Sequence, residues 1–264
     1  MFVFVFAVCM FAVGAVFSIF MPNIPADVNF MLIYFCSMIT IYGATLLIER
    51  VAFKRVLPVY NSRCGFNPIS LLLGVVLIIS ISIVLLPLEG VLSPDSRAFG
   101  DGPFTLITVV LLAPIFEEMI FRARLYNILS RNTSPLMSAS LSAVAFGAVH
   151  MEPIVVAEAL VVGVVFSYYY LSKRSIFAPV ILHIFNNAIA YSLIVLSYRG
   201  ESLRAIVGSG EMQLVVYVVA AAIVLCGAVV ILRFFVKEKR RMRGVECQDM
   251  ETLAEHHDPD QLAE

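Results

Sequence analysis

The sequence is short of charged residues. Asp, Glu, Lys and Arg make up only 14% of its 264 residues, while 61% are hydrophobic. Soluble domains carry about 25% charged residues, so this composition excludes a soluble globular protein and indicates a chain that crosses a membrane several times. The formal net charge is −1, and the sequence shows no basic face suited to nucleic acid. We therefore expect no nucleic-acid partner.

Several other features of soluble and secreted proteins are missing. The five cysteines show neither Cys-x-x-Cys nor metal-ligand spacing, which argues against a disulfide framework or a zinc cluster. The chain also lacks a His-Glu-x-x-His zinc-binding helix. Residues 1–20 are apolar but have no basic start and no small-residue cleavage site, so we interpret them as a retained helix rather than a signal peptide.

Eight apolar segments approach the length of about 20 residues that a spanning helix needs. They are residues 2–20, 28–48, 69–88, 104–129, 135–151, 154–172, 176–197 and 213–236. The sequence therefore predicts an all-α polytopic membrane bundle of about eight transmembrane helices. Residues 1–236 would form the transmembrane domain, and residues 237–264 a disordered cytoplasmic tail, basic at first and then acidic.

Lys and Arg gather in alternate links between these segments. The second, fourth and sixth links and the residues after the last segment carry most of them: Arg50, Lys54, Arg55, Arg63, Arg131, Lys173, Arg174 and residues 237–243. Cytoplasmic loops of membrane proteins hold the excess of cations. We therefore predict that both termini are cytoplasmic, and that the membrane is the plasma membrane if the host is prokaryotic.

Ionisable and amide side chains lie inside three of the middle segments, although a charge at the membrane centre costs about 2.5–3.5 kcal/mol. At a rise of about 1.5 Å per residue, these groups fall in one common band of the membrane interior. We therefore expect them to meet in a polar intramembrane cavity. They are Glu117, Glu118, Arg122, His150, His183 and Asn187.

Helical periodicity separates the two adjacent glutamates. Side chains four residues apart share a helix face, whereas adjacent ones point about 100° apart. Glu118 and Arg122 are therefore predicted to form an ion pair within one helix, and Glu117 must find its partner on another helix. A carboxylate without a partner on its own helix suits a general base.

Two further pairs of side chains share a helix face in the same way. His183 and Asn187 are neutral hydrogen-bond donors, and such a pair can hold a carbonyl oxygen as negative charge develops on it. The ring of Phe146 can orient the imidazole of His150, four residues later.

Each of these residues also has a purely structural interpretation. An ion pair such as that of Glu118 and Arg122 is, taken alone, more often structural than catalytic. His150 can simply bond a neighbour, and Asn187 can join two helices. These explanations account poorly for polar groups that occur together on three helices at one depth.

Three motifs carry a resemblance to a known family. Glu117–Arg122 reads EExxxR, Phe146–His150 reads FxxxH, and His183–Asn187 reads HxxxN. In this order on membrane helices, they resemble the CPBP family of intramembrane proteases, which takes in the CAAX prenyl endopeptidases and the bacteriocin-processing and immunity proteins. The resemblance covers residues 104–197, which form the motif core.

The resemblance implies a hydrolytic mechanism and a substrate class. The implied catalytic residues are Glu117, which would activate a water, His150, which would help to hold it, and His183 and Asn187, which would form the oxyanion hole; Glu118, Arg122 and Phe146 would support them. The substrate would be a lipidated CaaX-type or membrane-associated peptide or protein, cut near its C-terminus and reached among the membrane lipids.

We expect a metal-free glutamate mechanism without a cofactor. In the metal-dependent alternative, Glu117, His150 and His183 would bind zinc. The alternative from a different functional class is a non-catalytic membrane protein, either an immunity-type binder or a small transporter that uses the same cavity. A transporter would favour paired repeats with broken helices, and the sequence has no such repeat.

Overall fold

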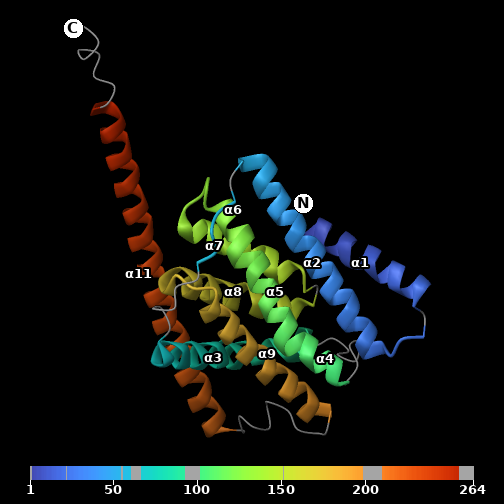
Figure 1. The fold of residues 1–264 in the computed structure, drawn as a ribbon. Helices are drawn as coiled ribbons and strands as arrows, with labels where there is room; N and C mark the ends of the chain where they lie inside the picture. Colours follow the sequence, from blue (N-terminus) through green and yellow to red (C-terminus); the bar gives the residue numbers. More distant parts are fainter. Residues whose placement is uncertain are drawn as a thin grey trace, which may run out of the picture.

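The computed structural model describes residues 2–21, 23–54, 56–60, 67–92, 102–150, 152–198 and 210–255. Within these ranges every extended regular element is a helix (Figure 1), so the all-α prediction is confirmed. The long helices are α1 (Phe2–Phe20), α2 (Ala26–Phe53), α3 (Pro68–Leu92), α7 (Pro135–Ala148), α8 (Pro153–Lys173), α9 (Phe177–Tyr198) and α11 (Glu211–Glu255).

The remaining predicted segment forms one continuous helical rod, Pro103–Leu129, whose winding changes along its length. It comprises α4 (Pro103–Ile107), the π-helix η3 (Thr108–Leu112), α5 (Ala113–Ile120), the π-helix η4 (Phe121–Tyr126) and α6 (Asn127–Leu129). The two glutamates lie on α5, between the two π-helical segments. We call Pro103–Leu129 the site helix.

Helices cover all eight of the predicted apolar segments. Five are long and apolar enough to cross a membrane: Ala26–Phe53, Pro68–Leu88, Pro103–Leu129, Pro153–Lys173 and Glu211–Met242. Three more are apolar but shorter in their described parts: Phe6–Phe20, Pro135–Ala148 and Phe177–Leu193. The chain is therefore an integral membrane protein, while the number of eight membrane crossings stays a prediction.

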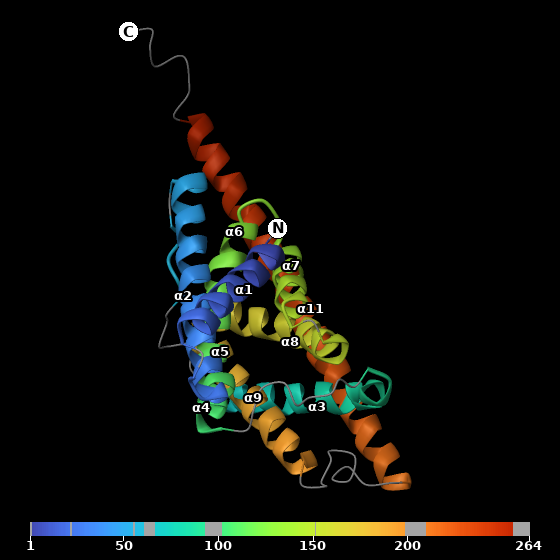
Figure 2. The same cartoon turned by 90° about the vertical axis from the view of Figure 1, so that its right-hand side faces the viewer.

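The C-terminal helix differs from the sequence-based expectation. We predicted disorder from residue 237, but α11 continues without a break to Glu255 and projects beyond the rest of the bundle (Figures 1 and 2). The extension is rich in Lys, Arg, Glu and Met, which favour helix, and Glu238 bonds Arg241 one turn later at 2.7 Å. Residues 256–264 lie outside the described residues. The division into two domains at residue 236 stays a prediction.

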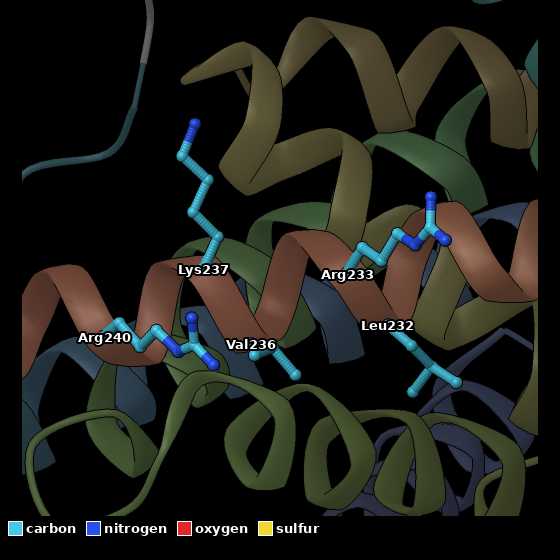
Figure 3. A pocket seen from close by; sticks show the side chains of 5 residues that line it. All are labelled: Leu232, Arg233, Val236, Lys237 and Arg240. Carbon is cyan, nitrogen blue, oxygen red and sulfur yellow. The ribbon is translucent and has the colours of Figure 1, made fainter.

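A shallow hollow marks the part of α11 where apolar sequence gives way to basic sequence. Figure 3 shows the side chains that line it, Leu232, Arg233, Val236, Lys237 and Arg240. Arg233 and Lys237 extend to one side of the helix, and Leu232 and Val236 to the other. This is the pattern of a helix that leaves the hydrocarbon layer with its long cationic side chains reaching for the interface. The hollow shares no residue with the three motifs.

Small residues let α7 and α8 approach each other closely. The face of α7 toward the bundle carries Ser138, Ala139, Ser142, Ala143 and Gly147, all of them buried. A Cβ atom built on Gly163 of α8 would lie 2.9 Å from Cβ of Ala143 and 3.1 Å from its Cα. Small residues at such contacts allow tight helix packing within membranes. Gly163 therefore sets the distance between these two helices.

Helix α2 runs parallel to the site helix along most of its length. A Cβ atom on Gly102 would touch Asp27 at the start of α2. Further along, Tyr34 contacts Glu117, and near the end of α2 Glu49 contacts Arg124. On the far side of the bundle, α3 packs against α11 and crosses it steeply (Figures 1 and 2). The site helix is thereby enclosed by α2, α7, α8 and α9.

We predict that Gly163→Ala destabilises the protein, because the added methyl group must displace the backbone of α7. Overpacking of this kind costs about 1–3 kcal/mol. The matched control is Gly43→Ala on α2, where a Cβ atom meets nothing within 4 Å. Thermal unfolding of the purified variants in detergent should show a lower midpoint for Gly163→Ala alone. Equal midpoints for the two variants would contradict the close approach of α7 and α8.

Candidate active site

The ion pair predicted from the sequence is present and fully buried. Nη1 of Arg122 lies 3.0 Å from Oε1 of Glu118, and both side chains are 0% exposed. Nη2 of Arg122 donates to the carbonyl of Gly163 at 3.1 Å. The guanidinium also lies over the ring of Phe146, 4.5 Å from its centroid, and 5.3 Å from that of Phe166. The guanidinium of Arg122 therefore contacts residues of three helices, α5, α7 and α8.

The partners of Glu117 lie on two other helices, as helical periodicity predicted. Its Oε1 accepts a hydrogen bond of 2.7 Å from the hydroxyl of Tyr34 on α2. Its Oε2 lies 3.6 Å from Nε2 of His183 on α9. The residue is 7% exposed, so its side chain is almost completely buried. Tyr34 was not among the sequence-predicted residues.

His183 joins the two glutamates. Its Nδ1 lies 2.9 Å from Oε1 of Glu118, while Nε2 faces Glu117. The ring stacks on Phe166 at a centroid distance of 4.8 Å and meets the edge of Phe146 at 5.5 Å. Both imidazole nitrogens are thus turned toward carboxylates, and aromatic rings hold the plane of the imidazole.

His150 approaches this group through Phe146. It follows the end of α7, where its Nδ1 lies 2.8 Å from the carbonyl of Phe146. The two rings pack edge to face at 4.9 Å. The ring of Phe146 also contacts Arg122 and His183, so it packs against several residues of the cluster and does not support His150 alone. In the tautomer that donates from Nδ1, Nε2 of His150 is an acceptor.

Asn187 bonds the backbone of the site helix at a particular point. Its Nδ2 donates to the carbonyl of Val109 at 2.9 Å. In η3 the backbone N–H of Ala113 bonds the carbonyl of Thr108, five residues back. By the same spacing, the backbone N–H of residue 114 would donate to the carbonyl of Val109, but Pro114 has no N–H. Asn187 therefore supplies the hydrogen bond that the proline cannot make.

The second π-helical segment has a comparable contact from a neighbouring helix. The hydroxyl of Ser142 on α7 donates to the carbonyl of Phe121, the first residue of η4, at 2.7 Å. Short π-helical turns inside α-helices are frequent at functional sites. Here they lie on both sides of Glu117 and Glu118, and side chains from α7 and α9 bond to their backbone carbonyls.

A second buried ion cluster lies near one end of the site helix, and the sequence reasoning missed it. Glu49 is 0% exposed and bonds Arg124 at 2.8 Å and Arg131 at 3.4 Å. Arg124 also donates to the carbonyl of Leu57 at 3.0 Å. Glu49 lies one residue beyond the predicted segment 28–48, where it resembled an ordinary interfacial charge. The cluster fastens the end of α2 to the site helix.

The described residues contain no group of three or more His, Cys, Asp or Glu side chains placed to hold a metal ion. The alternative ligand set of Glu117, His150 and His183 does not form one either. The nitrogens of His183 face the two glutamates, and Nδ1 of His150 lies against a backbone carbonyl. Glu118 thus contacts both Arg122 and His183, while Oε2 of Glu117 faces His183 without a hydrogen bond.

Comparison with known proteins identifies the motif core. Residues 100–189 match the model of a family described as type II CAAX prenyl endopeptidase Rce1-like. This stretch contains all three motifs, and the match confirms the resemblance found in the sequence. No curated protein and no solved structure matches the chain. Helices α1, α2, α3 and α11 lie outside the matched residues.

We predict that Pro114→Ala makes the stability of the protein less dependent on the hydrogen bond from Asn187 to Val109. Loss of the Asn187 amide removes this donor from the half-buried carbonyl of Val109, and an unsatisfied carbonyl costs about 1–3 kcal/mol. Alanine at position 114 restores an N–H, so Asn187→Ala should destabilise the Pro114→Ala protein much less than the unaltered one. Thermal unfolding of the four proteins in this double-mutant cycle measures the difference. Equal destabilisation in both backgrounds would refute the compensation.

Proposed function

We propose that the protein is an intramembrane endopeptidase in which Glu117 activates a water molecule. One observation carries the proposal: the buried carboxylate of Glu117 has one oxygen held by Tyr34 and the other turned toward His183. An acid and an imidazole at this separation can both contact one water molecule. The match of residues 100–189 to the CAAX prenyl endopeptidase family model supports peptide hydrolysis as the reaction.

The chemical steps follow from this pair. Glu117 accepts a proton from the water as the water oxygen bonds to the carbonyl carbon of the scissile peptide. The carbonyl oxygen then carries negative charge, which His183 and Asn187 stabilise. When the carbon–nitrogen bond breaks, Glu117 returns the proton to the leaving amine. The second water proton stays on the new carboxyl group and then passes to the new amino group or to the solvent, and Glu117 ends ionised as it began.

The role of His183 depends on its protonation. Its contact with the Glu118 carboxylate requires a proton on Nδ1, so a neutral ring leaves Nε2 as an acceptor that can only hold the water. The imidazolium donates from both nitrogens and can serve the oxyanion. With His183 in that form, the buried cluster of Glu117, Glu118, Arg122 and His183 has no net charge. We propose that the imidazolium is the active form.

Asn187 and His150 have the donor and acceptor capacity that their proposed roles need. The amide nitrogen of Asn187 carries two hydrogens, so the bond to Val109 leaves one for the oxyanion. Nε2 of His150 can accept from the attacking water while Nδ1 donates to Phe146. Phe146, Glu118 and Arg122 would hold the catalytic side chains in place.

The substrate we propose is a lipidated, CaaX-type or membrane-associated peptide or protein, cut near its C-terminus within a polar cavity of the bundle. We further propose eight membrane crossings with both termini in the cytoplasm, and the plasma membrane as the location in a prokaryote. The parallel course of α2 and the site helix supports the topology, because the second and fourth crossings must run in the same direction.

The second candidate function is a non-catalytic binder. His150 and Asn187 each bond a backbone carbonyl, as purely structural residues do. A binder would keep its cellular phenotype when Glu117 is replaced by glutamine, whereas a protease would lose it.

The two adjacent glutamates should respond differently to substitution. We predict that Glu117→Gln abolishes cleavage of a prenylated CaaX peptide, because an amide cannot accept the proton, while the protein stays folded. Glu118→Gln should instead lower the unfolding midpoint, because it weakens the buried partner of Arg122 and His183; breaking a buried pair costs about 3–5 kcal/mol. Product formation by mass spectrometry and thermal unfolding in detergent give both readouts.

His150→Ala is expected to lose cleavage as well, with a smaller change in stability because its side chain is only half-buried. Turnover of Glu117→Gln at the rate of the unaltered protein would overturn the assignment of the base.

We predict that removal of divalent metals leaves cleavage unchanged. The purified protein is treated with a chelator, assayed with the same peptide, and analysed for bound metals by mass spectrometry. One tightly bound zinc ion per chain, lost together with activity and restored with it, would show that the metal-dependent alternative is right.

A further inference from the structure

We infer that Tyr34 is a positioning residue of the active site: its hydroxyl holds Oε1 of Glu117 and leaves Oε2 as the oxygen that exchanges the proton. The catalytic part of this inference rests on the proposed function. The hydrogen bond itself does not, and it can be tested separately. Tyr34 lies on α2, outside the residues that match the CAAX endopeptidase family, so the three motifs do not include it.

The hydroxyl of Tyr34 makes a short contact in a buried place. It donates to Oε1 of Glu117 at 2.7 Å, and Tyr34 is only 8% exposed. Hydrogen bonds from a neutral donor to a carboxylate are stronger than those between neutral groups, and they favour the ionised acid. A general base must be ionised before it can accept a proton. Tyr34 thus supports the form of Glu117 that the proposed reaction needs.

Contacts on either side keep Tyr34 in register with Glu117. The next residue on α2, Phe35, packs edge to face on Phe116 at 5.6 Å. Phe30, one turn earlier, lies 6.2 Å from the Tyr34 ring. At the end of α2, the buried ion pair between Glu49 and Arg124 prevents the helix from sliding along the site helix. The position of the hydroxyl is therefore set by the packing of α2 as a whole.

The two oxygens of Glu117 consequently differ. Oε1 is occupied by Tyr34, whereas Oε2 is buried, accepts no hydrogen bond from the described residues and lies 3.6 Å from Nε2 of His183. Oε2 of Glu118 is also buried without a hydrogen bond, but the charge of that residue is already matched by Arg122. Of these two glutamates, Glu117 alone combines an anchored oxygen with an open one that faces an imidazole.

The decisive variant is Tyr34→Phe, which removes the hydroxyl and keeps the ring. Its matched control is Tyr42→Phe, which removes the same atom from the same helix two turns further on, beside Arg124. Each protein is treated with a hydrophobic carbodiimide, which forms a stable adduct with protonated carboxyl groups in apolar surroundings. Mass spectrometry of the peptide that contains both glutamates then reports each site, with Glu118 as the internal reference.

We expect carbodiimide labelling at Glu117 to rise several-fold in Tyr34→Phe and to stay unchanged in Tyr42→Phe, with labelling at Glu118 equal in all three proteins. Cleavage of the prenylated peptide should show a fall in kcat of roughly ten-fold in Tyr34→Phe with little change in KM, as for a group that acts in the transition state. Unchanged labelling and kcat, or equal effects of the two variants, would overturn the inference.

The outcomes also separate this inference from the proposed function. If the unaltered protein cleaves no peptide but Tyr34→Phe still raises labelling at Glu117, the positioning contact stands and the protease assignment fails. If Tyr34→Phe folds poorly, its effect on the unfolding midpoint is compared in the Glu117→Gln background. The effect must be smaller there, because an amide oxygen accepts a weaker hydrogen bond than a carboxylate. An equal effect would show that Tyr34 serves packing alone.

Discussion

The burial of two adjacent carboxylates inside a membrane protein is the constraint on which the rest of the structure depends. Glu118 is neutralised by Arg122 on its own helix, and His183 bonds the same oxygen. Glu117 points away and meets α2 and α9. A buried ion pair is costly to assemble and still costlier to leave half-made. The helices that bring Tyr34, Gly163 and His183 to these charges are therefore held in fixed relative positions.

The backbone of the site helix is organised by the same need. Pro114 leaves one carbonyl without its usual donor, and Asn187 supplies that donor from α9. Ser142 bonds the first carbonyl of the second π-helical segment from α7. These two bonds attach the backbone of the site helix to two neighbouring helices. The segment with the two glutamates is fixed by side chains of α7, which His150 follows, and of α9, which carries His183.

Helical periodicity predicted several of these features from the sequence. The spacing of Glu118 and Arg122 predicted their ion pair. The position of Glu117 on another face of the helix predicted that its partners lie on other helices. Neither Tyr34 nor Glu49 was found, because a tyrosine or a terminal glutamate on an apolar helix has no distinguishing pattern until the helices are packed. The bond from Asn187 to Val109 was equally hidden, since it depends on a π-helical turn. The extent of α11 was misjudged because its polar composition resembles that of a disordered tail.

The central claim is that Glu117 activates water and does not itself attack the peptide. The most direct test is a single turnover of the prenylated peptide, with enzyme in excess, in water enriched in oxygen-18. Mass spectrometry then examines the new carboxyl terminus and the peptide that contains Glu117. The account predicts one heavy oxygen in the new carboxyl group and none in the side chain of Glu117. Heavy oxygen in that side chain would reveal a covalent intermediate and contradict it.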